Sequence, residues 1–140
     1  MTATLSSHVL DTHLGKPACG IKVTLHFVEG EDIDNATNIS TTSACTSTTS
    51  SSTTSSTYLA EAVTNVEGRI SINDWHVNNE VLNIPPGNYT LTFETSNYFK
   101  DYDVEAFYPK VVITFIISDQ SHYHIPLLIS AHGYSTYRGS

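Results

Sequence analysis

The clearest strand signal in this chain is the run Ser121-His122-Tyr123-His124-Ile125-Pro126-Leu127-Leu128. Successive side chains of a strand point to opposite faces of the sheet. The apolar residues Tyr123, Ile125 and Leu127 therefore share one face, and the two histidines share the other. Because the apolar face must belong to the core, we expect His124 to point away from it, toward solvent or a partner subunit.

Similar alternation recurs upstream. Apolar and polar residues alternate at 21–27 and again at 89–93, directly after the turn Pro85–Asn88. A further strand is expected at Ser6–Asp11, with His8 on the face opposite Val9. Short strands separated by turn signals, together with one short helix, predict an all-β sandwich.

The other expected elements are less regular. Trp75 to Leu82 is a weak strand candidate, and Ser96 could cap a short helix that runs to about Tyr102. Val111–Ile117 is apolar on both faces, which predicts a central strand covered on each side. Thr64–Arg69 is expected to form a turn in which Gly68 is placed to take a positive φ.

One stretch has almost nothing to bury. From Ser40 to Thr57 every residue except Ala44 and Cys45 is serine or threonine. Such side chains compete for backbone hydrogen bonds and supply no core. We therefore expect one domain over residues 1–140, with a disordered loop at about 31–57 inserted in a hairpin at little entropic cost. A phosphorylated or interacting segment is the less favoured alternative.

Composition limits the partners. The 140 residues carry 14 acidic and 6 basic side chains, for a net charge of −8. This balance argues against nucleic acid and anionic membrane surfaces as partners. We find neither a signal peptide nor an apolar run long enough to span a membrane. We therefore expect a cytoplasmic protein, with the peroxisome as the alternative.

The residues that could carry chemistry are His8, Arg69 and His124, together with the terminal Tyr137-Arg138-Gly139-Ser140. Histidine can act as a base near neutral pH, and arginine supplies a permanent positive charge. Such groups in one cleft would suit hydrolysis of an anionic, planar, nitrogen-rich substrate. Each residue alone is a weak signal, because lone surface histidines and arginines are common.

A zinc site is the competing interpretation of the histidines. His122 and His124 could ligate the metal, with His8 as a third ligand. We rank this below acid–base catalysis because no carboxylate or cysteine completes the set. We therefore expect neither a metal nor another cofactor.

These segments together resemble the transthyretin-like 5-hydroxyisourate hydrolases. The resemblance covers about residues 5–30 and 58–140 and rests on five segments: Ser7–Asp11, Thr64–Arg69, Phe107–Pro109, Tyr123–Leu128 and Tyr137–Ser140. The terminal tetrapeptide is the most specific of these, because transthyretin itself shares the fold but not that ending. The loop at about 31–57 is longer than is usual in the family.

The resemblance implies a two-sheet transthyretin-like (prealbumin) sandwich of about eight strands that forms a homotetramer, with active sites in the channel between dimers. It implies hydrolysis of 5-hydroxyisourate in urate degradation. His8, Arg69 and His124 fall on the catalytic positions. Tyr137, Arg138, Gly139 and Ser140 fall on the substrate-binding ending.

Two other functions compete with this expectation. A transthyretin-type carrier of small hydrophobic ligands would have an apolar channel and would need no histidine pair or arginine. A structural or adhesive sandwich would have no pocket and is usually secreted. His8 and the ending Arg138-Gly139-Ser140 favour the hydrolase.

Overall fold

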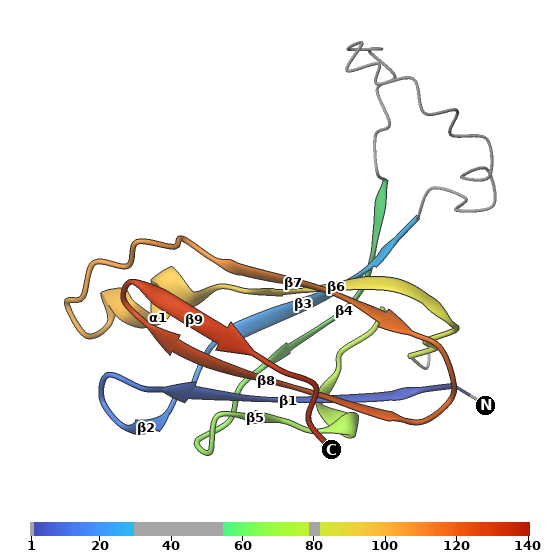
Figure 1. Cartoon of the computed structure of the whole chain (residues 1–140), viewed down its shortest axis with the longest axis horizontal. Coiled ribbons are helices and arrows are strands. Elements are labelled where there is room, and N and C mark those ends of the chain that lie inside the picture. Colours follow the sequence, from blue (N-terminus) through green and yellow to red (C-terminus); the bar gives the residue numbers. More distant parts are fainter. Residues whose placement is uncertain (1, 30–54, 79–81) are drawn as a thin grey trace, which may run out of the picture.

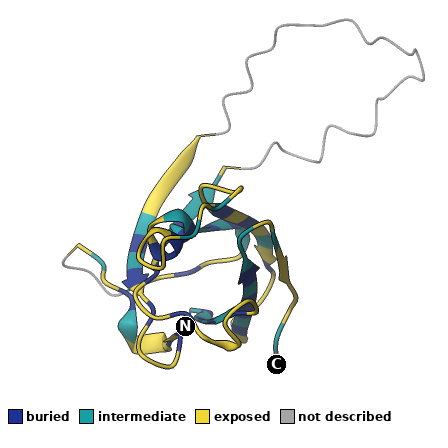
Figure 2. Ribbon diagram, turned by 90° about the vertical axis from the view of Figure 1, so that its left-hand side faces the viewer, coloured by how far each residue is buried: buried dark blue, intermediate teal, exposed yellow. Residues whose placement is uncertain are grey.

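The computed structural model describes residues 2–29, 55–78 and 82–140 as two packed β-sheets with one short α-helix (Figures 1 and 2). The first sheet has the order β2 (Lys16–Pro17), β1 (Thr4–Asp11), β8 (His122–Ser130), β9 (Gly133–Thr136), and β5 (Arg69–Ile70) also pairs with β1. The second has the order β4 (Ser56–Val63), β3 (Lys22–Val28), β6 (Gly87–Phe93), β7 (Val111–Ile117). The predicted all-β sandwich with one short helix is confirmed.

The core lies between the sheets. In β1 and β8 the buried residues alternate with partly exposed ones, and Pro126 is the exception in β8. Tyr89, Leu91 and Phe93 of β6 supply the facing side and are fully buried. Figure 2 shows that buried residues recur along the strands of both sheets. Side chains of the opposite parity, including His124, lie on the outer face as predicted.

The pairing of β1 with β8 brings distant parts of the sequence together. The two strands run parallel, with Ser6 opposite His124 and His8 opposite Pro126. β5 runs antiparallel to β1 on its other side and sets Arg69 opposite His8. The outer face of this sheet therefore carries side chains from three separate segments.

The prediction for Val111–Ile117 was wrong. β7 ends the order of the second sheet in the described chain, and Val112 and Ile116 are 46% and 69% exposed. The inner residues Val111, Ile113 and Ile117 are buried, as the pattern required. An apolar outer face looks the same in sequence whether helices, another subunit or water cover it.

Two smaller expectations also need correction. Residues 75–78 form no strand: Trp75 is buried and donates to the Leu5 carbonyl at 2.9 Å, while His76 makes an isolated bridge with Glu61. α1 (Thr95–Lys100) begins before Ser96, with Glu94 at its N-cap, and ends before Tyr102. β9 was not predicted at all. A short 3-10 helix, η2 (Ile72–Asp74), completes the described elements.

The predicted insertion lies outside the described residues up to position 54. β4 begins at Ser56, before Tyr58, where we expected order to resume. No helix in the described part of the chain is long and apolar enough to cross a membrane.

Candidate active site

A pocket of about 280 Å³ lies on the outer face of the first sheet, where β1, β5 and β8 meet the C-terminal residue. Its lining includes Ser6, Arg69, His122, His124 and Ser140. These residues come from one face of the parallel strand pair, from the start of β5 and from the chain end. Two of the predicted catalytic residues and one residue of the terminal tetrapeptide therefore share one pocket.

The C-terminal segment reaches this pocket by crossing the outer face of the sheet (Figure 1). Beyond β9, the Gly139 N–H donates to the His124 carbonyl at 2.8 Å. A Cβ atom on Gly139 would lie 2.5 Å from Cδ2 of His124 and 3.1 Å from its Cγ. Glycine is thus required here for close packing against the imidazole, and this contact places Ser140 at the pocket.

The surroundings of His124 favour its neutral form. Its pKa is lowered first by burial and then by the positive charge of Arg69, with smaller contributions from His122 and His8. Burial disfavours the imidazolium, and nearby cations repel it. At neutral pH this ring is therefore available as a base.

His8 lies beside the pocket and is not among its lining residues. Its Nε2 is 2.9 Å from the carbonyl oxygen of Glu67, in the turn before β5. Its charge is the smallest of the causes that lower the pKa of His124. The structure thus brings Arg69 and His124 together directly and places His8 next to them.

The terminal tetrapeptide spans both sides of His124. Tyr137 and Arg138 line a neighbouring, largely apolar pocket of about 310 Å³, which His124 also borders. The guanidinium carbon of Arg138 lies 4.8 Å from the ring centre of Tyr123, a cation–π contact. Ser140 lines the first pocket on the other side of the imidazole.

Sequence reasoning did not assign Ser6 to the site, and it considered His122 only as a possible zinc ligand. Ser6 Oγ lies 2.8 Å from His124 Nδ1 and 2.8 Å from His122 Nε2. Strand parity had placed His122 on the face away from the core and had not decided whether Ser6 points inward or outward. Only the register between β1 and β8 shows that they meet, and no single-strand pattern reveals it.

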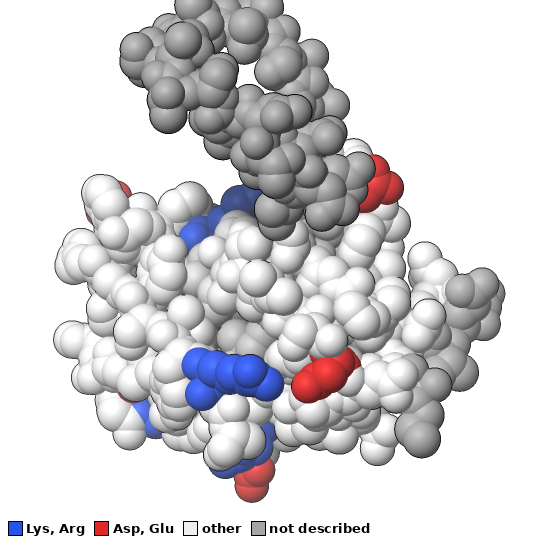
Figure 3. Space-filling model, turned by 45° about the vertical axis from the view of Figure 1, so that its right-hand side comes forward, with Lys and Arg blue, Asp and Glu red and all other residues white. Residues whose placement is uncertain are grey.

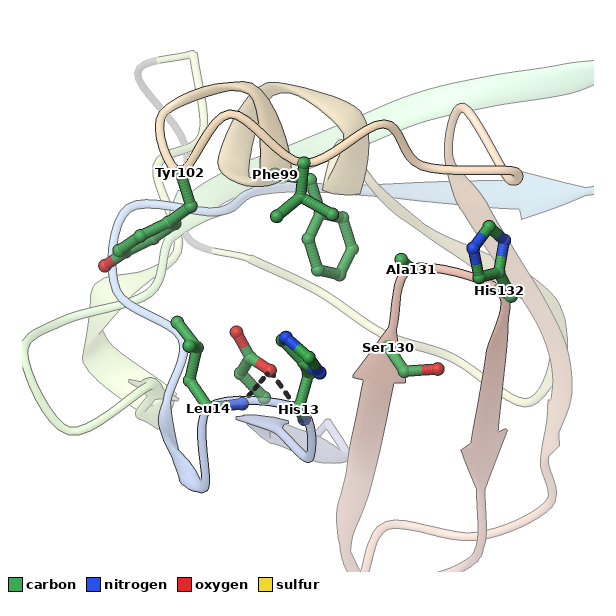
Figure 4. A pocket seen from close by; sticks show the side chains of 9 residues that line it. His13, Leu14, Phe99, Tyr102, Ser130, Ala131 and His132 are labelled. Atoms are coloured by element: carbon green, nitrogen blue, oxygen red, sulfur yellow. Dashed lines mark hydrogen bonds between the residues drawn. The ribbon is translucent and has the colours of Figure 1, made fainter.

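A third pocket, of about 250 Å³, lies at the far end of β1 between Asp11, Phe99 and His132 (Figure 4). Its buried carboxylate is already fully engaged. Asp11 Oδ1 accepts from the backbone N–H groups of His13 and Leu14, and Oδ2 accepts from the Tyr98 hydroxyl at 2.8 Å. This arrangement stabilises a turn and gives the carboxylate a structural role.

Arg69 is the one lysine, arginine, aspartate or glutamate among the residues that line the first pocket. The face shown in Figure 3 is mostly uncharged, with isolated basic and acidic side chains. Against this background a single arginine dominates the field in a small pocket, which suits an anionic ligand. Within the described ranges, no three His, Cys, Asp or Glu residues cluster as a metal site would require.

Known proteins are similar to this chain in both sequence and fold. A probable 5-hydroxyisourate hydrolase of Schizosaccharomyces pombe is 35% identical over 136 residues, covering 97% of this chain and 90% of the relative. 5-Hydroxyisourate hydrolase 2 of Rhizobium meliloti is 37% identical over 142 residues, covering 97% and 95%. The structure of Klebsiella pneumoniae 5-hydroxyisourate hydrolase matches with a TM-score of 0.68 and 34% identity, covering 99% of this chain and 100% of the other.

Sea bream transthyretin, solved in complex with thyroxine, has a TM-score of 0.71 at 19% identity, covering 98% of this chain and 95% of that one, which shows the fold alone. The two-sheet sandwich therefore has the transthyretin-like fold. Residues 5–139 match the HIUase/Transthyretin family, and the chain belongs to that family.

Proposed function

We propose that this protein is a 5-hydroxyisourate hydrolase, an enzyme that opens the cyclic amide of its substrate. The product would be 2-oxo-4-hydroxy-4-carboxy-5-ureidoimidazoline, in urate degradation. The observation that carries the proposal is the shared pocket of His124, Arg69 and Ser140. Relatives named 5-hydroxyisourate hydrolase, similar over nearly the whole chain, support the same reaction.

His124 is the general base in this mechanism. It borders the pocket and has a lowered pKa, whereas Nε2 of His8 is engaged by the Glu67 carbonyl. His124 removes a proton from water, which attacks the lactam carbonyl, and His8 helps to position that water. Arg69 holds the substrate anion or stabilises the oxyanion.

The terminal tetrapeptide binds substrate. Ser140 lines the pocket itself, and Gly139 allows the chain to pack against the imidazole. Tyr137 and Arg138 close the opposite side of His124. No cofactor and no metal take part in the mechanism.

The protein acts as a homotetramer of single-domain subunits in the cytoplasm, with the peroxisome as the alternative compartment. The apolar outer face of β7 supports assembly, since Val112 and Ile116 are exposed at a sheet edge in the described chain. Exposed strand edges with apolar side chains are natural pairing surfaces. Neither nucleic acid nor membrane is a partner.

The test is an ultraviolet decay assay. Urate oxidase converts urate to fresh 5-hydroxyisourate, and the decay of its absorbance is followed with and without the protein. We expect acceleration that disappears in His124→Asn and in a chain lacking Tyr137–Ser140. A folded tetramer that gives no acceleration would overturn the hydrolase and favour a transthyretin-type carrier, to be probed by ligand binding.

A further inference from the structure

A chain of hydrogen bonds links His124 to the protein surface. Thr4 Oγ1 lies 2.8 Å from His122 Nδ1, and Ser6 Oγ bridges His122 Nε2 and His124 Nδ1 at 2.8 Å each. The parallel register explains the arrangement, because Thr4 lies opposite His122 and Ser6 opposite His124. All four side chains lie on the outer face of β1 and β8.

While both imidazoles are neutral, the single hydrogen of the Ser6 hydroxyl allows only two ways to place the hydrogens in this series of hydrogen bonds. A serine hydroxyl has one hydrogen to donate and must accept from its other partner. If Ser6 donates to His122, then Nδ1 of His124 carries the hydrogen and its Nε2 is bare. If Ser6 donates to His124, then Nε2 of His124 carries the hydrogen and cannot act as a base.

The geometry points to Ser6 as a positioning residue: we propose that its hydroxyl passes a proton between His124 and His122 during hydrolysis. This inference rests on the proposed function, because it takes His124 as the base. Among the described residues, Nε2 of His124 makes no hydrogen bond to protein, so it is the nitrogen available to water. The resting arrangement is therefore the one in which Ser6 donates to His122.

The proton transfers balance in both halves of the reaction. A water proton moves to Nε2 of His124, its Nδ1 proton moves to Ser6, and the Ser6 proton moves to Nε2 of His122. The resulting hydroxide adds to the carbonyl carbon. When the carbon–nitrogen bond breaks, Nε2–H of His124 protonates the leaving nitrogen, and the chain returns the proton from His122 through Ser6.

The electrostatic surroundings of the two histidines favour transfer of the proton from His124 to His122. His124 is half-buried and faces Arg69 from β5, His8 from β1 and the C-terminal Ser140. A second positive charge there is opposed by burial and by the arginine. His122 is exposed, so that water can solvate an imidazolium at that position. Thr4 accepts the remaining Nδ1–H of His122.

The first test reads hydrogen positions without turnover. Nitrogen-15 NMR of histidine-labelled protein distinguishes the two neutral tautomers of each ring. We expect His124 of the wild type to carry its hydrogen on Nδ1, Ser6→Ala to shift it toward Nε2, and Ser6→Thr to restore the wild-type state. Identical tautomers in wild type and Ser6→Ala would overturn the proposal, whatever the enzyme assay shows.

The second test measures catalysis. Residues that orient metal-bound histidines are typically worth about 10–100-fold in activity, and we take the same range for Ser6, which orients a catalytic histidine. We expect Ser6→Ala to lower kcat by about that factor with KM nearly unchanged, and Ser6→Thr to recover most of it. The exposed His122→Asn should lower kcat similarly, because an amide cannot hold the proton.

Thermal unfolding controls for folding in all three variants. Wild-type kcat in both Ser6→Ala and His122→Asn would overturn the relay while leaving the hydrolase intact. Absence of turnover in the wild type would instead overturn the proposed function, and the NMR result would still report whether Ser6 couples the two rings.

Discussion

At the scale of single residues, the chemistry of the site depends on the residues that surround the imidazole of His124. Burial and Arg69 lower the pKa of His124, Ser6 bonds its Nδ1, and Gly139 packs against its ring. Each contact comes from a different segment of the chain. The chemistry of this histidine is thus set by its surroundings, since an isolated one titrates near pH 6.5.

The lowered pKa predicts the pH dependence of the enzyme. The neutral ring is the base, so kcat/KM should fall only as pH drops below the ordinary histidine pKa of about 6.5. Arg69→Gln removes a cation that lowers the pKa of His124, so the acidic limb should move to higher pH. Burial, the larger cause, remains. An acidic limb at the same pH in wild type and Arg69→Gln would contradict the assigned base.

Gly139 offers a sharp steric prediction. An added Cβ would meet the His124 ring at 2.5 Å, so Gly139→Ala should displace the imidazole and lower kcat by about 100-fold, the effect of roughly 1 Å misplacement. Gly133→Ala is the matched control, because its nearest neighbour would be Ser130 Oγ at 3.8 Å. Equal activity of both variants in the decay assay would show that this packing is unimportant.

At the scale of elements, the turn before β5 sets the position of Arg69. The side-chain oxygen of Asn65 accepts from the backbone N–H groups of Glu67 and Arg69 at 2.9 and 3.0 Å. Gly68 has the predicted positive φ of 72° and packs against the Val9 carbonyl oxygen. Its own carbonyl accepts from the Val9 N–H at 2.7 Å, which fastens the turn to β1.

Comparing Gly15 with Gly68 separates the energetic cost of a positive φ from the cost of a steric clash. Gly15 has a φ of 68° and open space where the Cβ of an alanine would lie, so Gly15→Ala should cost only about 1 kcal/mol of unfolding free energy. Gly68→Ala adds a clash with the Val9 carbonyl oxygen and should cost at least about 2 kcal/mol. Denaturant unfolding measures both, and equal losses would refute the contact.

At the scale of the whole molecule, the exposed face of β7 is the surface that remains to be covered. Its side chains alternate between the core and the outside, and the outer ones include Val112 and Ile116. An apolar sheet edge on a monomer invites pairing with another chain. The proposed tetramer would bury it.

The role of β7 in tetramer assembly can be tested by introducing a charged side chain on its outer face. Ile116→Glu should place carboxylates in the subunit interface and reduce the tetramer to smaller species in analytical ultracentrifugation, because an unpaired buried charge is costly. Val66→Glu is the control, since Val66 is 82% exposed in the turn before β5. A tetramer that survives Ile116→Glu would exclude this face of β7 from the interface.

The sequence by itself determined the sandwich, the inward and outward faces of β8, the division of β1 into two faces, and the left-handed glycine at 68. These follow from local rules: side-chain alternation needs only one strand, and a positive φ needs only one residue. Resemblance in motifs also picked out His8, Arg69, His124 and the terminal tetrapeptide. Periodicity alone would not have found them.

Only the tertiary structure decided which of these groups meet. The register of β1 against β8 joins Ser6 to both histidines, and the crossing of the C-terminal segment brings Ser140 to Arg69. It also showed that β7 lies at an edge, where sequence predicted a covered strand. Such facts depend on contacts between residues far apart in the chain, and no pattern within one segment encodes its partner.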